Sequence, residues 1–100
     1  MTRITARPAR RVHGTHFALA VSPLPEGTGP KFTCVVSKKT ASKAADRNRI
    51  KRHCREAMRS VLRGRTEHRA YVLHAKAEAR SASGTEITVD IERLMEKSHG

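Results

Sequence analysis

The chain has 100 residues, enough for one small domain and too few for two independent cores. Its 21 Lys and Arg residues against 9 Asp and Glu residues give a formal net charge of +12, which indicates a polyanionic partner. No apolar run approaches the roughly 20 residues of a membrane helix, and residues 1–11 lack the apolar stretch of a signal peptide. We therefore expect a cytoplasmic protein without a membrane role, whose thin core is marginally stable until counter-charge binds.

The N-terminal third predicts an arm followed by two strands. Residues 1–13 are basic and hold few apolar residues, so we expect an arm ahead of a domain over residues 14–100. Apolar residues at every second position predict one strand over residues 16–22 and a second over residues 31–36. The nine-residue loop between the strands is rich in Pro and Gly and favours an antiparallel hairpin.

A long helix is predicted from residue 42 or 43 to residue 63. Ser42 is placed to cap its N-terminus, and Gly64 is placed as a left-handed residue beyond its C-terminus. A third strand over residues 69–75 and a final helix, from Thr85 or Thr88 to residue 97, complete the chain. This order of elements implies an α+β domain with a small sheet and helices packed on it.

Most of the positive charge lies in and just before the long helix. Residues 38–63 carry +8 of the total of +12. At 100° per residue, one helix face is apolar and should pack on the sheet: Ile50, Cys54, Ala57, Met58 and Val61. The opposite stripe has no acid: Asn48, Arg52, Arg55 and Arg59. Like charges at this spacing repel by a few tenths of a kcal/mol per pair, so the stripe favours a bound phosphate backbone over a merely solvated surface.

Cysteine and histidine give little support for catalysis or metal binding. Cys34 and Cys54 are too few for a disulfide scaffold. In the cytoplasm we expect both as reduced, buried, apolar residues. The six histidines are scattered, and none has the spacing of a zinc ligand or the context of a general base. We therefore predict no catalytic residue and no metal ligand in the chain itself.

The stretch from Ser37 to Arg59, SKKTASKAADRNRIKRHCREAMR, resembles the signature of the bacterial ribonuclease P protein subunit. In that family a strand ends in Ser-Lys-Lys, and a helix then opens with Arg-Asn-Arg and continues Lys-Arg-x-x-Arg-x-Ala. The resemblance covers roughly residues 10–98. It implies an αβββαβα-like domain with a left-handed βαβ crossover. The first helix would be missing or reduced here, because little chain precedes Phe17.

The resemblance also implies a function. The protein would be the accessory subunit of an endoribonuclease whose catalytic RNA subunit cleaves precursor tRNA at the mature 5′ end, with Mg²⁺ held by that RNA. It would bind the RNA subunit and the 5′ leader of precursor tRNA, as a monomer within the holoenzyme. Matched by position, the residues expected at the RNA subunit are Arg49, Arg52, Arg55, Arg59, Lys38 and Lys39. Those expected at the leader are Arg47, Asn48, Lys51, His16 and Phe17.

Three alternatives stay open, one for the stacking residue and two for the function. The family tends to carry an aromatic residue where this chain has Ala20, so His16 or Phe17 would have to supply the stacking surface, although Phe17 also fits the core. A structural RNA-binding protein, such as a ribosomal protein, would show a similar basic helix. A protein-only nuclease has weaker support, because Asp90 and Glu92 would diverge on a helix.

Overall fold

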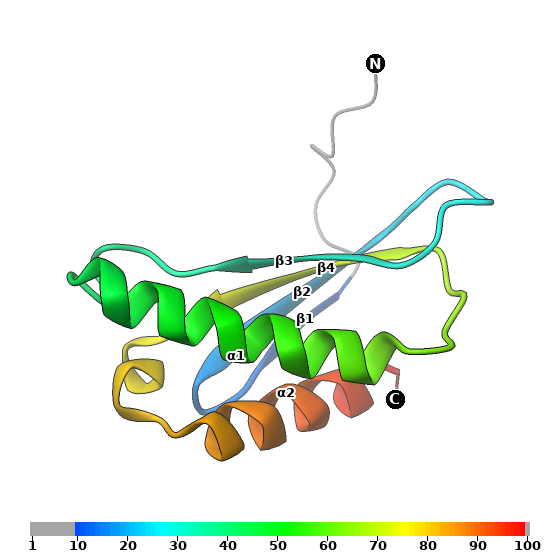
Figure 1. Ribbon diagram of the computed structural model, residues 1–100. Helices are drawn as coiled ribbons and strands as arrows, with labels where there is room; N and C mark the ends of the chain where they lie inside the picture. The colour runs from blue at the N-terminus through cyan, green and yellow to red at the C-terminus, as the bar shows by residue number, and fades with distance from the viewer. Residues whose placement is uncertain (1–9, 100) are drawn as a thin grey trace.

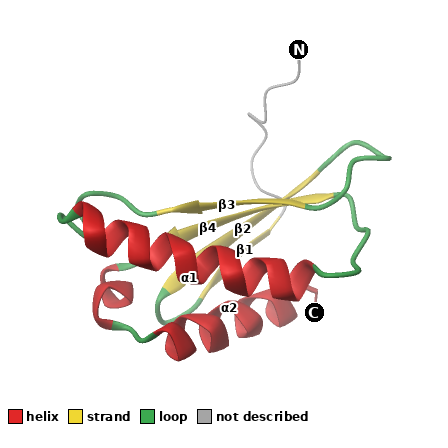
Figure 2. Cartoon of the chain, in the orientation of Figure 1, coloured by secondary structure: helices red, strands yellow, loops and turns green. Residues whose placement is uncertain are grey.

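The computed structural model describes residues 10–99, in which two helices cover one face of a four-stranded sheet (Figures 1 and 2). The strands are β1 (Arg10–His13), β2 (Phe17–Pro23), β3 (Lys31–Val35) and β4 (Arg69–Ala75). The helices are α1 (Ala44–Leu62) and α2 (Gly84–His99), with a short 3₁₀ helix η1 (Ala77–Ser81) before α2. The fold class is therefore α+β, as the sequence predicts.

The strand order is β1-β2-β4-β3, which corrects the predicted hairpin. β2 is antiparallel to both β1 and β4, whereas β3 runs parallel to β4. Because β4 lies between β2 and β3, the Pro- and Gly-rich loop spans the sheet instead of closing a hairpin. A parallel pair needs a crossover connection. Helix α1 supplies it, with the left-handed sense that the resemblance implies (Figure 1).

The N-terminal arm is shorter than predicted within the described residues. Arg10–His13 form β1 and pair with β2 from Arg10↔Val21 to His13↔Ala18. Val12 is the only apolar residue of β1, so pairing with β2 and not local pattern makes this segment a strand. Residues 1–9, which hold the rest of the arm and the place of any first helix, lie outside the described residues.

The core lies between the sheet and the two helices. Alternate residues of β2 and β4 point into it, and the buried faces of α1 and α2 close it from the other side. The largest side chains with less than 2 % exposure are Tyr71, Phe17, Leu19, Ile50, Met58, Leu73, Ile87, Ile91, Leu94, Met95 and Cys54. This arrangement fixes the buried side of α1 and turns its opposite side to solvent.

The helix ends agree only in part with the sequence. Lys43, not Ser42, is the N-cap of α1, and its side chain makes no capping hydrogen bond. Gly64 has φ +77, the left-handed residue predicted after α1. At α2 the hydroxyl of Ser83 accepts the Glu86 N–H at 3.1 Å, and the Glu86 carboxylate accepts the Ser83 N–H at 2.8 Å. That Ser83 N–H lowers the pKa of Glu86.

A buried carboxylate joins α2 to the β1–β2 turn. Asp90 accepts the backbone N–H groups of Thr15, His16 and Phe17 at 3.0, 3.1 and 3.0 Å. The turn wraps closely around the carboxylate, because a Cβ placed on Gly14 would lie 2.8 Å from its oxygens. Asp90 is therefore structural, and its packing accounts for Gly14.

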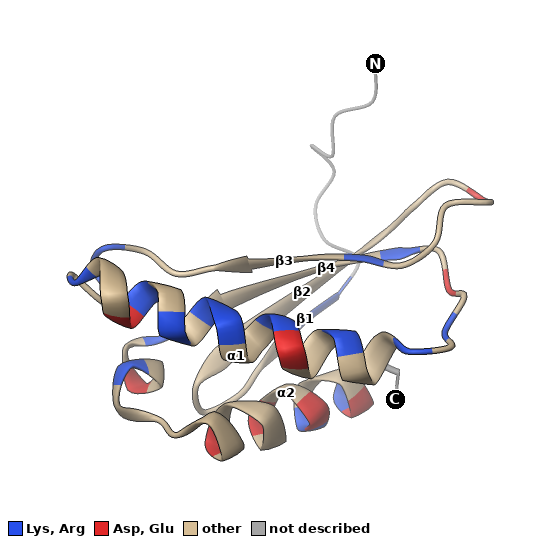
Figure 3. Ribbon diagram, viewed as in Figure 1, with Lys and Arg blue, Asp and Glu red and all other residues tan. Residues whose placement is uncertain are grey.

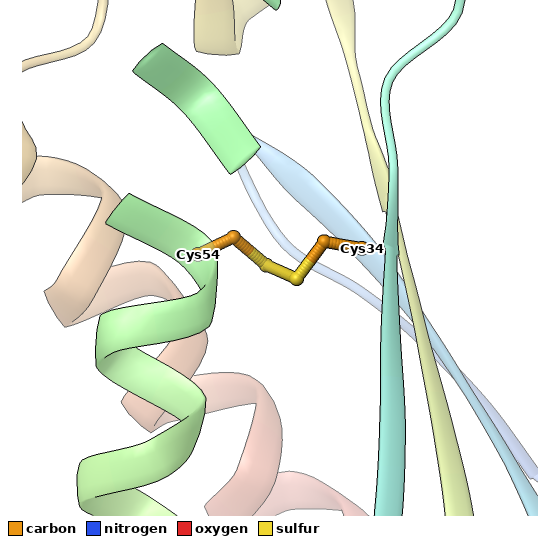
Figure 4. The surroundings of a disulfide bond; sticks show 2 residues. All are labelled: Cys34 and Cys54. Atoms are coloured by element: carbon orange, nitrogen blue, oxygen red, sulfur yellow. A yellow bond between two sulfur atoms is a disulfide. The ribbon is translucent and has the colours of Figure 1, made fainter. Parts of the chain in front are cut away.

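The two cysteines are joined, which corrects the prediction that both are reduced. Cys34 of β3 and Cys54 of α1 form a disulfide, with their Cα atoms 6.5 Å apart (Figure 4). This separation lies within the usual range for disulfides. Cys54 is indeed fully buried, as predicted. The bond ties the edge strand of the sheet to the basic helix.

No helix among residues 10–99 is both long and apolar enough to cross a membrane.

Candidate nucleic-acid interface

The outer ridge of α1, defined as Asn48, Arg52, Arg55 and Arg59, is exposed along its whole length. Bands of Lys and Arg recur along α1, which also contains Asp46 and Glu56, while α2 carries both signs of charge (Figure 3). Side-chain ion pairs within residues 10–99 include His53–Glu56 at 3.7 Å and Arg65–Glu67 at 3.3 Å. Neither includes a ridge arginine, so the ridge presents uncompensated guanidinium groups that suit bidentate contact with phosphate.

Arg49 differs from the ridge, although it was predicted to face the same RNA. Its Nη1 donates to the Ala82 carbonyl at 3.0 Å, and its Nη2 donates to the Arg80 carbonyl at 2.7 Å. The side chain is half-buried and points toward η1 and the start of α2. Beside it, His53 packs so closely on Gly84 that a Cβ there would lie 2.8 Å from the imidazole. This flank of α1 fastens the helix to the C-terminal part of the fold.

Lys38 and Lys39 lie where the chain leaves β3 and approaches α1. Both are exposed, in a turn in which the Thr40 N–H donates to the Ser37 carbonyl at 3.1 Å. Their charges extend the basic surface beyond the N-terminus of α1.

The predicted leader residues are not brought together. Arg47 and Lys51 are half-buried on the flank of α1 that faces β3, next to the Cys54 side of the helix. Arg47 donates to the Ala41 and Ser42 carbonyls at 2.9 and 2.8 Å. Asn48 belongs to the outer ridge instead.

The predicted stacking role of Phe17 is wrong. Its side chain is 0 % exposed within the core, so its ring cannot meet a base. His16 is half-buried beside α2, in a cavity of about 270 Å³ that it shares with Glu86, Val89 and Arg93. Neither residue lies beside the flank of α1 that faces β3, where Arg47 and Lys51 are.

Burial raises the pKa of Tyr71 to about 12, and its hydrogen bond to Glu67, 2.9 Å long, adds to the effect. Burial alone would raise the pKa of Glu67, but the Tyr71 hydroxyl and the Arg65 guanidinium outweigh it and lower that pKa. This pair lies in β4 and the loop before it and holds that loop to the core. It offers no catalytic arrangement.

Within residues 10–99, no three His, Cys, Asp or Glu side chains converge on a point that could hold a metal ion.

Four basic or imidazole side chains are exposed on the sheet face that carries no helix, and the sequence predicted no site there: Arg11, His13, Lys31 and His74. The signal was present in β3 and β4, because their alternation places Lys31 and His74 opposite the core residues. The sequence of β1 shows no such alternation, and it was not predicted to be a strand.

The family model for ribonuclease P matches residues 2–99 of the chain. No curated protein matches it. The fold is similar to that of the Staphylococcus aureus RNase P protein, with a TM-score of 0.76 and 21% identity over 89% of this chain and 80% of that one. A variant of that protein with defective mRNA degradation activity gives a TM-score of 0.77 and 21% identity over 90% and 75% of the two chains.

The Thermotoga maritima RNase P protein, in complex with 1-(4-fluorophenyl)-2-thiourea, has a TM-score of 0.76 and 16% identity over 88% of this chain and 84% of that one. At these identities the structural likeness establishes the fold, and the family match over nearly the whole chain establishes kinship. The RNR-containing helix α1 connects β3 to β4, as the resemblance predicts. The chain therefore belongs to the bacterial ribonuclease P protein family.

Proposed function

We propose that this protein is the accessory subunit of ribonuclease P and binds the catalytic RNA through the outer ridge of α1. The observation that carries the proposal is the row of exposed arginines without carboxylate partners, in a chain of this family. Neutralising phosphates with such a row releases counterions from the RNA, which drives association at moderate salt. Lys38 and Lys39 extend this contact toward the loop between β3 and α1.

The cleavage chemistry belongs to the RNA subunit in this proposal. Mg²⁺ held by that RNA would activate the attacking water. The protein contributes positive charge, which lowers the repulsion between the catalytic RNA and precursor tRNA. One copy of the chain serves each holoenzyme, in the cytoplasm, where precursor tRNA is processed.

The second part of the proposal is binding of the 5′ leader. Arg47 and Lys51 lie on the flank of α1 next to β3, the edge strand of the sheet. Arg47 also donates to the Ala41 and Ser42 carbonyls, so Lys51 is the main leader contact in this proposal. A single strand that leaves the RNA subunit at the outer ridge would pass these two residues first. His16 and Phe17 have no part in this path, because one lies beside α2 and the other is in the core.

Reconstitution tests the proposal. The protein is mixed with ribonuclease P RNA and precursor tRNA at low Mg²⁺, and the rate of 5′ cleavage is measured with substrates that have a long leader or none. We expect stimulation by the wild-type protein and its loss in the double variant Arg52→Glu/Arg55→Glu. An Arg93→Glu variant on α2 is the matched control and should stimulate as the wild type does. Absence of stimulation, together with tight binding to ribosomal RNA, would instead assign the chain to the structural RNA-binding proteins.

A further inference from the structure

The disulfide between Cys34 and Cys54 links the edge strand β3 covalently to the basic helix α1 (Figure 4). The chain has no other cysteine, so neither residue has an alternative partner within the protein. The proposed function places the protein in the cytoplasm, where glutathione and thioredoxin keep thiols reduced and disulfides are usually transient. A disulfide in that compartment is therefore expected to open and close.

The two sulfur atoms differ in their access to solvent. Cys34 is half-buried, on a strand at the edge of the sheet. Cys54 is 0 % exposed and packs in the core. A thiolate from solution can therefore reach the sulfur of Cys34 but not that of Cys54. Lys51 lies three residues before Cys54 on the same side of α1, so its positive charge lies near the sulfur that would leave.

We infer that Cys34 and Cys54 form a reversible redox switch, which exchanges through Cys34 with a low-molecular-weight thiol of the glutathione class. The inference rests on the proposed function for its cytoplasmic setting and for its effect on the 5′ leader. In the first step the thiolate of the small thiol forms a bond to the Cys34 sulfur. The bond between Cys34 and Cys54 breaks, and Cys54 leaves as a thiolate that takes up a proton.

A second small thiolate completes the reduction. It attacks the sulfur of the small thiol in the mixed disulfide on Cys34, and Cys34 leaves as a thiolate that takes up a proton. The products are the protein dithiol, which has gained two electrons, and the disulfide of the small thiol, which has lost them. The same steps in reverse, starting from the small-molecule disulfide, form the protein disulfide again.

The position of the disulfide gives the switch a structural effect. Helix α1 is fastened on one side by Arg49, which donates to the carbonyls of Arg80 and Ala82, and on the other side by the disulfide. Reduction releases only the second side. Two thiols in van der Waals contact lie farther apart than two bonded sulfur atoms, so β3 and the middle of α1 should separate on reduction.

This separation affects the flank of α1 that the proposed function assigns to the leader. Lys51 is half-buried on that flank, next to β3. A wider interval exposes its ammonium group, so the reduced form should bind the leader more tightly than the oxidised form. The outer ridge lies on the opposite side of α1 and is exposed in either form, so binding to the RNA subunit should not change. The switch therefore controls leader binding and not assembly.

The exchange chemistry is tested on the free, full-length protein without RNA. The protein is incubated with reduced glutathione or with glutathione disulfide, alkylated and analysed by mass spectrometry. We expect the bond to open in the first and to form again in the second, without a stronger reductant or oxidant. Cys54→Ser should take up one glutathione on Cys34, whereas the matched variant Cys34→Ser should take up none on the buried Cys54. In wild type, the mixed disulfide trapped during reduction should likewise map to Cys34, which keeps the test valid if a variant unfolds.

Three results of this assay would overturn the inference. A bond that persists in reduced glutathione and opens only with a stronger dithiol would be a permanent structural brace. Thiols that stay free in glutathione disulfide would show that the bond does not form under such conditions. Glutathione that maps to Cys54 in wild type would contradict entry through Cys34.

The effect on the leader is tested with the reconstituted holoenzyme. The reduced form should bind precursor tRNA with a leader about tenfold more tightly than the oxidised form, and the two forms should bind the leaderless substrate equally. By linkage, the leader-bearing substrate should favour reduction of the bond by the same factor. The double variant Cys34→Ser/Cys54→Ser should bind as the reduced form does, with or without glutathione disulfide. Equal or weaker leader binding in the reduced form would overturn the switch while leaving stimulation of cleavage, and with it the proposed function, intact.

Discussion

Arg49 and Arg52 are three residues apart on the same helix, yet they lie in different surroundings. Arg49 is half-buried and its guanidinium is fixed by two backbone carbonyls of the segment before α2. Arg52 is exposed, without an ion pair among the described residues. Arginine content alone therefore does not define an exposed basic surface. The helix has a structural flank and an exposed ridge, which only the packing of α1 distinguishes.

The largest effect is expected on the ridge. Replacing Arg52 and Arg55 with Glu should weaken binding to ribonuclease P RNA on the order of a thousandfold, about 4 kcal/mol, because two phosphate contacts become repulsive. The slope of log K against log salt should flatten by about 0.7–0.9 per lost contact. Filter binding over a range of salt concentrations measures both. Unchanged affinity would remove the ridge from the interface.

The second-largest effect is expected from removing the disulfide. This change affects the stability of the fold more than it affects the charge of the ridge. Cys34 and Cys54 are 20 residues apart. A loop of this length predicts that the double variant Cys34→Ser/Cys54→Ser loses about 3 kcal/mol of unfolding free energy. Urea unfolding measures the loss, and wild-type protein in a strong reductant should be destabilised in the same direction. A midpoint that does not respond to the reductant would show that β3 and α1 are not covalently tied.

Tyr71 provides a test of the core. Its pKa is raised to about 12, so the folded state retains the phenol proton at a pH where the unfolded chain, with a pKa near 10, has lost it. This contribution is present below pH 10 and is lost as the pH rises toward 12, by about 2 kcal/mol. Urea unfolding should show a shallower fall over this range in Tyr71→Phe than in wild type. Identical pH profiles would contradict the buried Tyr71–Glu67 pair.

The smallest effect concerns Arg49 itself. Arg49→Ala should cost about 1–2 kcal/mol of stability through the two lost hydrogen bonds. Arg52→Ala should stay within about 0.5 kcal/mol. When the protein is fully folded, Arg49→Ala should bind RNA with the same slope of log K against log salt as the wild type. A slope that flattens by about 0.7–0.9 would place Arg49 on the RNA instead.

Sequence reasoning identified most elements because their patterns are local. Alternation located β2 and β3, the apolar run Tyr71–Leu73 located β4, and the apolar stripe of α1 identified its buried side. The strand order was beyond such patterns, because the pairing of β3 with β4 depends on where α1 packs. β1 has one apolar residue, so its strand state depends on β2.

The exposure of a site residue could be predicted where it follows from the helical period, as it does for the ridge arginines. It could not be predicted where a contact with a residue distant in the sequence determines it. Arg49 is an example of the second case, because the carbonyls that hold it come from residues 80 and 82. The spacing of Cys34 and Cys54 likewise carries no local sign that β3 and α1 meet there. Phe17 fits either a core or a stacking role by pattern, and its place in the sheet decides for the core.

Photo-crosslinking tests the central claim most directly. A p-azidophenylalanine replaces either Arg59 on the outer ridge or Arg93 on the exposed side of α2, and each protein is assembled with ribonuclease P RNA and irradiated. We expect an RNA crosslink from position 59 and none from position 93. A crosslink from position 93 without one from position 59 would place the RNA on α2 and not on the outer ridge.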